Sequence, residues 1–383
     1  MKKLNFIVIP YRDRYFLEKY GNAVRDLHMI QALAACPDVA CVSVFNRPVS
    51  LHERLLLSKS VRLGTQPHDE FPGVHWVDRT DSALLGPFKK RLWLEHCYRP
   101  WHDQISALKK PDATNVLLDF TPLSKIDYAS IGCEVTWYDA IDNFTKHNRF
   151  SEREIELVEE KYAYVSQRAD FISAVSAGAL AAAGGGAQGI VVPNGLPIDK
   201  AQNAPVARAN NAYDFGFMGF VTDKFDIQLL TELSRFGYSV GIFGEVYDRA
   251  TESQLKRIRG VSVLGGFNQK QASEISRKFR VGLIPYLKRK LHDESPLKLY
   301  QYLNWGKPVL ASVSYEVNSP YICVYDGLTT QALGIACERL LSFSGDTSVS
   351  NEIARSVNND MRWTCKIGKI IDVIGNLEKL RGL

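Results

Sequence analysis

The sequence contains no CxxC pair, no apolar run that could cross a bilayer and no segment typical of a secretory signal. Its seven cysteines are an odd number scattered along the chain, so neither a disulfide framework nor a structural zinc site is indicated. The first apolar run, at 6–10, is too short for a signal peptide, and charged residues follow it at once. A membrane-spanning helix needs roughly 20 apolar residues, which no run approaches. These absences predict a cytoplasmic, reduced protein.

The charge balance is nearly even, with 47 lysines and arginines against 42 aspartates and glutamates. An excess this small and local does not suit nucleic-acid binding. Basic and aromatic residues are interleaved in the stretch 88–110, namely Lys89, Lys90, Arg91, Arg99, Lys109 and Lys110 with Trp93, Tyr98 and Trp101. Such a stretch fits an anionic membrane surface, on which the protein would be peripheral at the inner face. The alternative is a solvated helix whose rings face the core.

Short apolar runs alternate with amphipathic segments over the first 200 residues. Strands are expected at 4–10, 41–45, 115–120, 134–138, 170–176 and 189–195. Helices are expected within 21–39 and at 151–169, where Ser151 and Glu154 have the spacing of a capping box.

The alternation repeats after a polar, aperiodic segment at 201–213 that is typical of a linker. Strands are expected at 214–220, 238–244, 261–267, 281–286 and 307–312, and helices at 225–237, 268–280, 295–306 and 363–380. This pattern predicts an α/β protein with two doubly wound, Rossmann-like domains, at 1–200 and 201–360, and a closing helix at 361–383. The first strand is not followed by the GxGxxG turn that a nicotinamide-dependent oxidoreductase would need there.

The helix expected at 295–306 opens with Ser295, Pro296, Leu297 and Lys298. Ser295 can be the N-cap, and Pro296 suits the first turn. A lysine in that turn opposes the helix dipole, at a cost of about 0.3–1 kcal/mol. The arrangement makes sense if backbone amides and Lys298 hold an anion such as a diphosphate. The alternative is a surface lysine on an ordinary helix.

Two carboxylates, Asp139 and Asp142, follow the strand at 134–138 within the heptapeptide YDAIDNF. A carboxylate at the end of a strand can accept a proton from a substrate hydroxyl. Asp139 is nearer the strand and could instead cap the turn through an Asx-type hydrogen bond.

Five segments, at 169–180, 190–197, 215–233, 295–312 and 359–375, resemble in this order parts of the GT-B glycosyltransferases of the group 1 or family-four type. Among these, the chain is most similar to bacterial surface-polysaccharide enzymes, such as teichuronic acid glycosyltransferases and the xanthan glucuronosyltransferase. The resemblance implies two Rossmann-like domains that face each other across a cleft, with a C-terminal helix that crosses back to the N-terminal domain. It also implies a nucleotide sugar as donor substrate, UDP being favoured, and neither a metal nor another cofactor.

One departure from the family bears on the mechanism. Retaining members carry two glutamates where this chain has Asp293 and Gln301. Gln301 can still bond a ribose hydroxyl, but the glutamate pair is missing. In inverting enzymes of this fold, a carboxylate that follows a strand of the N-terminal domain is the general base. The xanthan enzyme has its base in a similar stretch, and the matching residue here is Asp142, with Asp139 as its rival.

The resemblance and the spacing together give a set of candidate site residues. The donor-binding candidates are Gly219, Phe220, Phe267, Asn268, Tyr286, Ser295, Pro296, Leu297, Lys298 and Gln301. Arg25 and His28 share a helix face and are candidates for binding the acceptor, with a structural role as the alternative. We expect an inverting glycosyltransferase that acts on a lipid-linked or growing surface glycan. A retaining transferase and a non-catalytic glycan- or lipid-binding protein of the same architecture remain alternatives.

Overall fold

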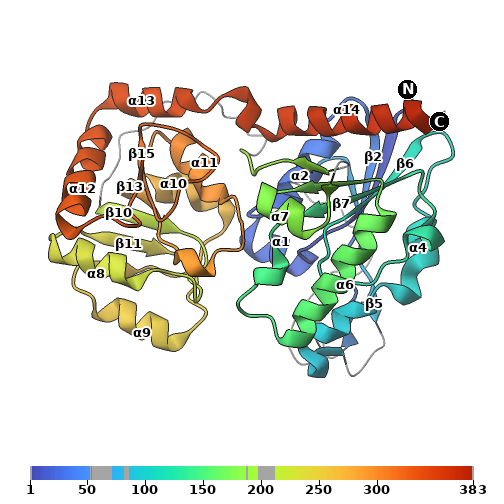
Figure 1. Ribbon diagram of the computed structural model, residues 1–383, viewed down its shortest axis with the longest axis horizontal. Helices are drawn as coiled ribbons and strands as arrows, with labels where there is room; N and C mark the ends of the chain where they lie inside the picture. Colours follow the sequence, from blue (N-terminus) through green and yellow to red (C-terminus); the bar gives the residue numbers. More distant parts are fainter. Residues whose placement is uncertain are drawn as a thin grey trace. The chain divides into compact units, whose positions relative to one another are not determined.

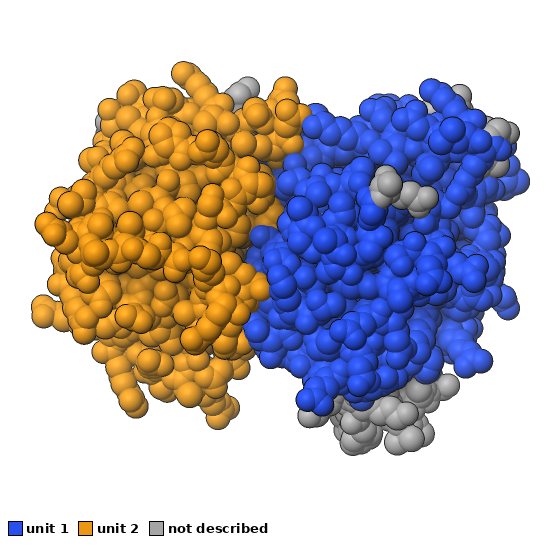
Figure 2. Space-filling view, viewed as in Figure 1, with its two compact units in different colours: residues 1–198, 292–294, 362–383 blue, residues 199–291, 295–361 orange. Residues whose placement is uncertain are grey.

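The structure is a computed structural model. It describes residues 2–51, 53, 71–81, 86–186, 189–196 and 212–381, with the backbone alone at 86–90. Two compact units are distinguished in Figure 2: unit 1 holds residues 1–198, 292–294 and 362–383, and unit 2 holds 199–291 and 295–361. Residues 292–294 were expected in the second domain, but the structure assigns them to unit 1. Within the described ranges, no helix has the length and apolar character needed to span a bilayer.

Unit 1 is built on a sheet of seven parallel strands in the order β4-β2-β1-β6-β7-β8-β9 (Figure 1). They are β1 (Leu4–Ile9), β2 (Val39–Phe45), β4 (Val74–Val77), β6 (Thr114–Asp119), β7 (Val135–Ala140), β8 (Phe171–Ala174) and β9 (Gly189–Val191). Every residue of β1, β6 and β7 is buried, as expected for central strands covered on both faces. All of these strands except β4 were predicted.

The helices of unit 1 are α1 (Arg14–Tyr20), α2 (Arg25–Ala34), α4 (His102–Ser106), α5 (Tyr128–Ile131), α6 (Glu152–Arg168), α7 (Ala177–Ala182) and α14 (Trp363–Arg381). Shorter elements are β3 (Val49–Ser50), β5 (Thr80–Asp81), η1 (Gly86–Glu95), η2 (Arg99–Trp101) and η3 (Phe144–Lys146). The predicted capping box is confirmed, because Ser151 and Glu154 bond each other's backbone at the start of α6. The C-terminal helix α14 packs against α2.

Unit 2 has six parallel strands in the order β12-β11-β10-β13-β14-β15. They are β10 (Tyr213–Met218), β11 (Val240–Phe243), β12 (Val261–Val263), β13 (Phe279–Ile284), β14 (Val309–Ala311) and β15 (Ile322–Val324). Its helices are α8 (Ile227–Arg235), α9 (Arg249–Arg257), α10 (Ala272–Ser276), α11 (Leu297–Asn304), α12 (Thr330–Ser344) and α13 (Thr347–Ser356), with η5 (Gln269–Gln271), η6 (Lys288–Lys290) and η7 (Asn359–Met361). Most of the predicted linker, 201–211, lies outside the described residues.

The strand order reverses once in each sheet, which is the mark of a doubly wound fold. The reversal lies between β1 and β6 in unit 1 and between β10 and β13 in unit 2. Ligands of such sheets bind beyond the carboxyl ends of the strands at this switch point. The loops after β10 and β13 are therefore the place to look for a ligand site in unit 2.

The rings of the basic stretch pack on the core of unit 1. Tyr98 is 1% exposed, and Trp93 and Trp101 lie partly buried against the same core. Arg91 donates to the carbonyl of Arg149 and to Glu154. The side chains of Lys89 and Lys90 lie outside the described residues. For the described rings, the alternative in which they face the core is the one observed.

Candidate functional site

Glycines bring the loops after β10 and β11 into close contact at the carboxyl edge of the unit 2 sheet. Gly219 donates its backbone N–H to Phe243 O at 2.8 Å. A Cβ atom on Gly244 would lie 1.8 Å from Gly219 O, so no other residue fits at 244 without moving the loop. The loops after β11 and β12 pair in turn through Gly244 and Gly265. This edge of the sheet is consequently lined by backbone.

Lys298, in the first turn of α11, lies at the switch point of unit 2. Its Nζ donates to the Tyr286 hydroxyl and lies 4.9 Å from the centre of that ring. The ring of Phe217 is 5.0 Å away on the β10 side. A Cβ atom on Gly219 would be 3.5 Å from Lys298 Nζ. Three predicted donor-binding residues, Gly219, Tyr286 and Lys298, are thus brought together.

A second cation of this cluster was not predicted. Lys224, in the loop after β10, places its Nζ 4.6 Å from the centre of the Tyr286 ring. Tyr286 therefore lies within reach of two ammonium groups, one from each side of the switch point. The sequence shows that Lys224 follows Gly219 in the same loop. That Lys224 lies next to Tyr286 is seen only in the folded structure.

The expected N-cap of α11 is corrected by the structure. The helix begins at Leu297, its N-cap is Pro296, and no side chain caps it. Ser295 lies one residue too early, and its hydroxyl bonds Glu316 and Tyr300 instead. No side-chain hydrogen bond caps this end of the helix, and the N–H of Leu299 donates to Pro296 O at 3.0 Å.

The remaining donor-binding candidates are spread around the same edge of unit 2. The ring of Phe220 stacks on Tyr247, with centroids 5.2 Å apart. Asn268 forms a capping box with Gln271 at the start of η5. Phe267 and Gln301 are half-buried, the former after β12 and the latter on α11.

In unit 1, Asp139 forms a buried ion pair. Its side chain is 0% exposed and accepts from Arg25 Nε at 2.7 Å and from Arg25 Nη2 at 2.8 Å. The hydroxyl of Ser173 donates to the same carboxylate at 2.5 Å. Arg25 also donates to the carbonyl of Val192. These contacts give Asp139 a structural role within the sheet.

Arg25 and His28 do not present an acceptor surface in this structure. Their exposed fractions are 4% and 1%, and His28 Nε2 bonds Asn22 O at 2.9 Å. Burial lowers the pKa of His28 to about 4, which keeps the imidazole neutral. The helical face that they share is turned into the core, so the structural alternative describes them better.

Asp142 is only partly buried, in the loop after β7. The hydroxyl of Tyr162 donates to its backbone carbonyl at 3.1 Å, and the N–H of Phe144 donates to that hydroxyl at 3.2 Å. The loop is thus anchored to α6. Asp142 differs from Asp139 in burial: Asp142 is partly exposed, whereas the side chain of Asp139 is fully buried.

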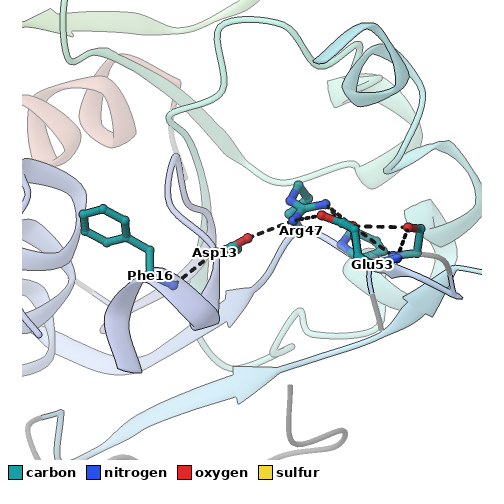
Figure 3. A network of polar contacts seen from close by, with 6 residues as sticks. Asp13, Phe16, Arg47 and Glu53 are labelled. Atoms are coloured by element: carbon teal, nitrogen blue, oxygen red, sulfur yellow. Dashed lines mark hydrogen bonds and ion pairs between the residues drawn. The ribbon is translucent and has the colours of Figure 1, made fainter. Parts of the chain in front are cut away.

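A third group of polar contacts joins the ends of β1 and β2 (Figure 3). Arg47 pairs with Asp13 at 2.8 Å and with Glu53 at 2.9 Å, while Asp13 accepts from the backbone of Phe16. Burial alone would lower the pKa of Arg47, but the two carboxylates more than offset it and raise that pKa. The network fixes the start of α1 at the carboxyl edge of the unit 1 sheet. Among the described residues, no group of three or more His, Cys, Asp or Glu side chains could hold a metal ion.

Comparisons with known proteins agree with this architecture. AviGT4, a glycosyltransferase involved in avilamycin A biosynthesis, matches with a TM-score of 0.57 and 14% identity, over 100% of this chain and 99% of that one. Anabaena HepE, solved in complex with UDP-glucose, matches with a TM-score of 0.59 and 13% identity, over 98% and 100%. The chain has the GT-B fold. The fold expected from the sequence is confirmed.

In sequence, the chain is similar to TuaH of Bacillus subtilis (strain 168), which is assigned to teichuronic acid biosynthesis as a glycosyltransferase. The two are 24% identical over 186 residues, which is 46% of each chain. The match therefore spans less than half of TuaH. No protein-family model matches the chain.

The enclosed Asp139–Arg25 pair predicts a stability defect rather than a specific loss of catalysis. We expect Asp139→Asn to lower the free energy of unfolding by about 3–5 kcal/mol, because it leaves a buried arginine unpaired. Urea unfolding measures this. Glu156→Gln, which breaks an exposed pair with Arg153 in the same unit, is the control and should leave stability unchanged. An Asp139→Asn protein of full stability but without activity would instead make Asp139 a catalytic residue.

Proposed function

We propose that this chain is an inverting glycosyltransferase that moves a sugar from a UDP-sugar to a hydroxyl group of a surface glycan. The observation that supports this best is the cluster of Lys298, Lys224, Tyr286 and Gly219 at the switch point of unit 2. It combines two ammonium groups, a glycine backbone and the uncapped start of α11, which is the chemistry that a diphosphate needs.

Lys298 and the helix amides would act on the leaving group. As the bond to the anomeric carbon breaks, the diphosphate gains negative charge, and fixed positive groups stabilise that charge more than they stabilise the ground state. Tyr286 holds the Lys298 ammonium in place through its hydroxyl. Lys224 would add a second positive charge.

Asp142 would be the general base. In a single displacement the acceptor hydroxyl loses its proton as it attacks, and a carboxylate within hydrogen-bond reach takes that proton. Asp142 suits this role better than Asp139, because Asp142 is only partly buried, whereas Arg25 and Ser173 enclose the carboxylate of Asp139.

The choice of substrates is supported by similarity. HepE is solved with UDP-glucose, which favours UDP as the nucleotide. TuaH is assigned to teichuronic acid biosynthesis, which favours a cell-envelope glycan as acceptor. The alternatives are a retaining transferase and a glycan- or lipid-binding protein without activity. Asp293 weighs against the first, because its carboxylate is bonded to Lys146 and Asn143.

Lys298→Gln is expected to raise the Kd for UDP by about 10- to 100-fold, since a charge-assisted hydrogen bond contributes about 1.5–3 kcal/mol. Isothermal calorimetry with UDP measures this. Lys256→Gln on the exposed helix α9 is the matched control and should bind as the wild type does. An unchanged Kd in Lys298→Gln would show that the diphosphate does not bind at this cluster. Absence of UDP binding in the wild type would favour the non-catalytic alternative.

Asp142→Asn is expected to keep the wild-type Kd for UDP but to lower turnover by about 10²–10⁴-fold, because the base is lost while the donor site is intact. Turnover is followed as UDP release, and the anomeric configuration of the product by NMR. Inversion of the donor's configuration is expected. Retention, together with full activity of the variant, would support the retaining alternative.

We further propose that the bases at 88–110 hold the protein on an anionic membrane. Lys89→Glu/Lys90→Glu should then weaken binding to vesicles that contain anionic lipid, by about 1 kcal/mol per lysine removed. Arg91 is left unchanged, because it pairs with Glu154. Lys256→Glu/Lys278→Glu is the control. Equal binding of both variants and the wild type to anionic vesicles, or equal wild-type binding to neutral ones, would contradict the proposal.

A further inference from the structure

Three residues that precede α11 in the chain belong to unit 1 and lie on the loop that carries Asp142. We call His292-Asp293-Glu294 the HDE segment. The backbone N–H of Asn143 donates to His292 O at 2.9 Å. His292 Nε2 is 2.9 Å from Asn148 Nδ2, and its ring centre is 5.0 Å from that of His147. The segment thus covers the loop from 143 to 148.

Asp293 makes the strongest of these contacts. Both of its carboxylate oxygens lie 2.8 Å from Lys146 Nζ, and Oδ2 also accepts from Asn143 Nδ2 at 2.8 Å. Burial opposes the charged carboxylate, but the bonds from Lys146 and Asn143 outweigh it, and the pKa of Asp293 is lowered. The side chain is therefore an anion with its partners in place.

The backbone conformation of Asp293 and the absence of a side chain at Gly178 both suit this contact. With φ of 57°, Asp293 is the one described residue other than glycine in the left-handed region. Such conformations persist where the surrounding structure enforces them, and they gather at functional sites. Gly178, in α7, leaves space for the Asp293 side chain, because a Cβ atom at position 178 would lie 2.6 Å from Asp293 Cγ.

The peptide unit that links Asp142 to Asn143 is held at both of its polar groups. Its backbone carbonyl accepts from Tyr162 on α6, and the next residue, Asn143, is held by the HDE segment through both its backbone N–H and its side chain. Both hydrogen bonds hold this one peptide plane, and they restrain the backbone at Asp142.

We propose that Asp293 is a positioning residue that orients Asp142 through Asn143 and Lys146. The inference rests on the proposed function, in which Asp142 is the general base. Displacing a reacting group by about 1 Å can cost 10²-fold in rate. A residue that never touches the substrate can therefore control turnover by holding the loop at 142–143.

The first test measures position directly and needs no substrate. Asp293→Asn keeps an acceptor for Asn143 and tolerates the positive φ, but it loses the ion pair with Lys146. We expect the amide hydrogens of 143–148 to exchange about tenfold faster with solvent, as measured by hydrogen–deuterium exchange of the full chain. Glu156→Gln, on α6 of the same unit, is the control and should not change this exchange. Wild-type exchange in Asp293→Asn would overturn the proposal, whatever the enzyme's activity.

Gly178→Ala gives an independent variant that removes no charge. Alanine favours a helix over glycine by about 1 kcal/mol, so the variant should fold and keep its melting temperature. Its added Cβ nevertheless displaces Asp293. Faster exchange at 143–148 without loss of thermal stability is expected, and unchanged exchange would contradict the role of this contact.

The kinetic test uses UDP release from UDP-glucose as the probe reaction. Asp293→Asn and Lys146→Met should each lower kcat by about 10- to 100-fold at an unchanged KM, since the donor is assigned to unit 2. The double variant should be no worse than either single one, because both remove the same interaction. Positioning would be refuted if exchange at 143–148 became faster while kcat stayed unchanged, or if the kcat losses of the two single variants added up in the double variant.

The proposed function can survive without this inference. That would be the result if Asp142→Asn abolished UDP release while Asp293→Asn changed neither kcat nor the exchange at 143–148.

Discussion

The ion pair between Arg25 and Asp139 is the interaction on which the arrangement of unit 1 depends. Arg25 reaches from α2 to β7 and to the carbonyl of Val192 after β9, and its guanidinium lies 5.1 Å from the ring centre of Trp363 on α14. One side chain thus ties together elements that are far apart in the sequence. A buried pair of this kind adds little net stability compared with an apolar contact, but losing one partner is costly. The pair therefore matters for specificity: it holds α2 against the end of β7 and the segment after β9.

The end of β7 shows how a fold separates two similar residues. Asp139 is still in the strand, where its buried side chain pairs with Arg25. Three residues later the strand has ended, and Asp142 lies in a partly exposed loop. The same side chain is enclosed in an ion pair at one position and partly exposed at the other. Burial decides the difference.

The sequence predicted most of the fold, and three of its donor-binding candidates lie together at the switch point of unit 2. Parallel strands buried on both faces are apolar runs, so β1, β6 and β7 could be identified directly. The capping box at Ser151 was also predictable, because it is local. The role of Arg25 was not, since its partner is 114 residues away. The prediction that Ser295 is the N-cap of α11 was wrong for a similar reason. Its hydroxyl bonds Glu316 and Tyr300, and these partners cannot be inferred from the local sequence. Lys224 was missed because its neighbour Tyr286 lies across the switch point.

Asp293 shows why a matched position does not carry its function with it. The resemblance puts this residue where retaining relatives have a glutamate, yet here the side chain is shorter and bonded to Lys146 and Asn143. The lowered pKa of Asp293 keeps it ionised, and its positive φ directs it toward those partners. A carboxylate committed in this way serves poorly as a direct contact for a transferred sugar. The contacts of Asp293 with Lys146 and Asn143 instead give this carboxylate a part in holding the loop that follows Asp142.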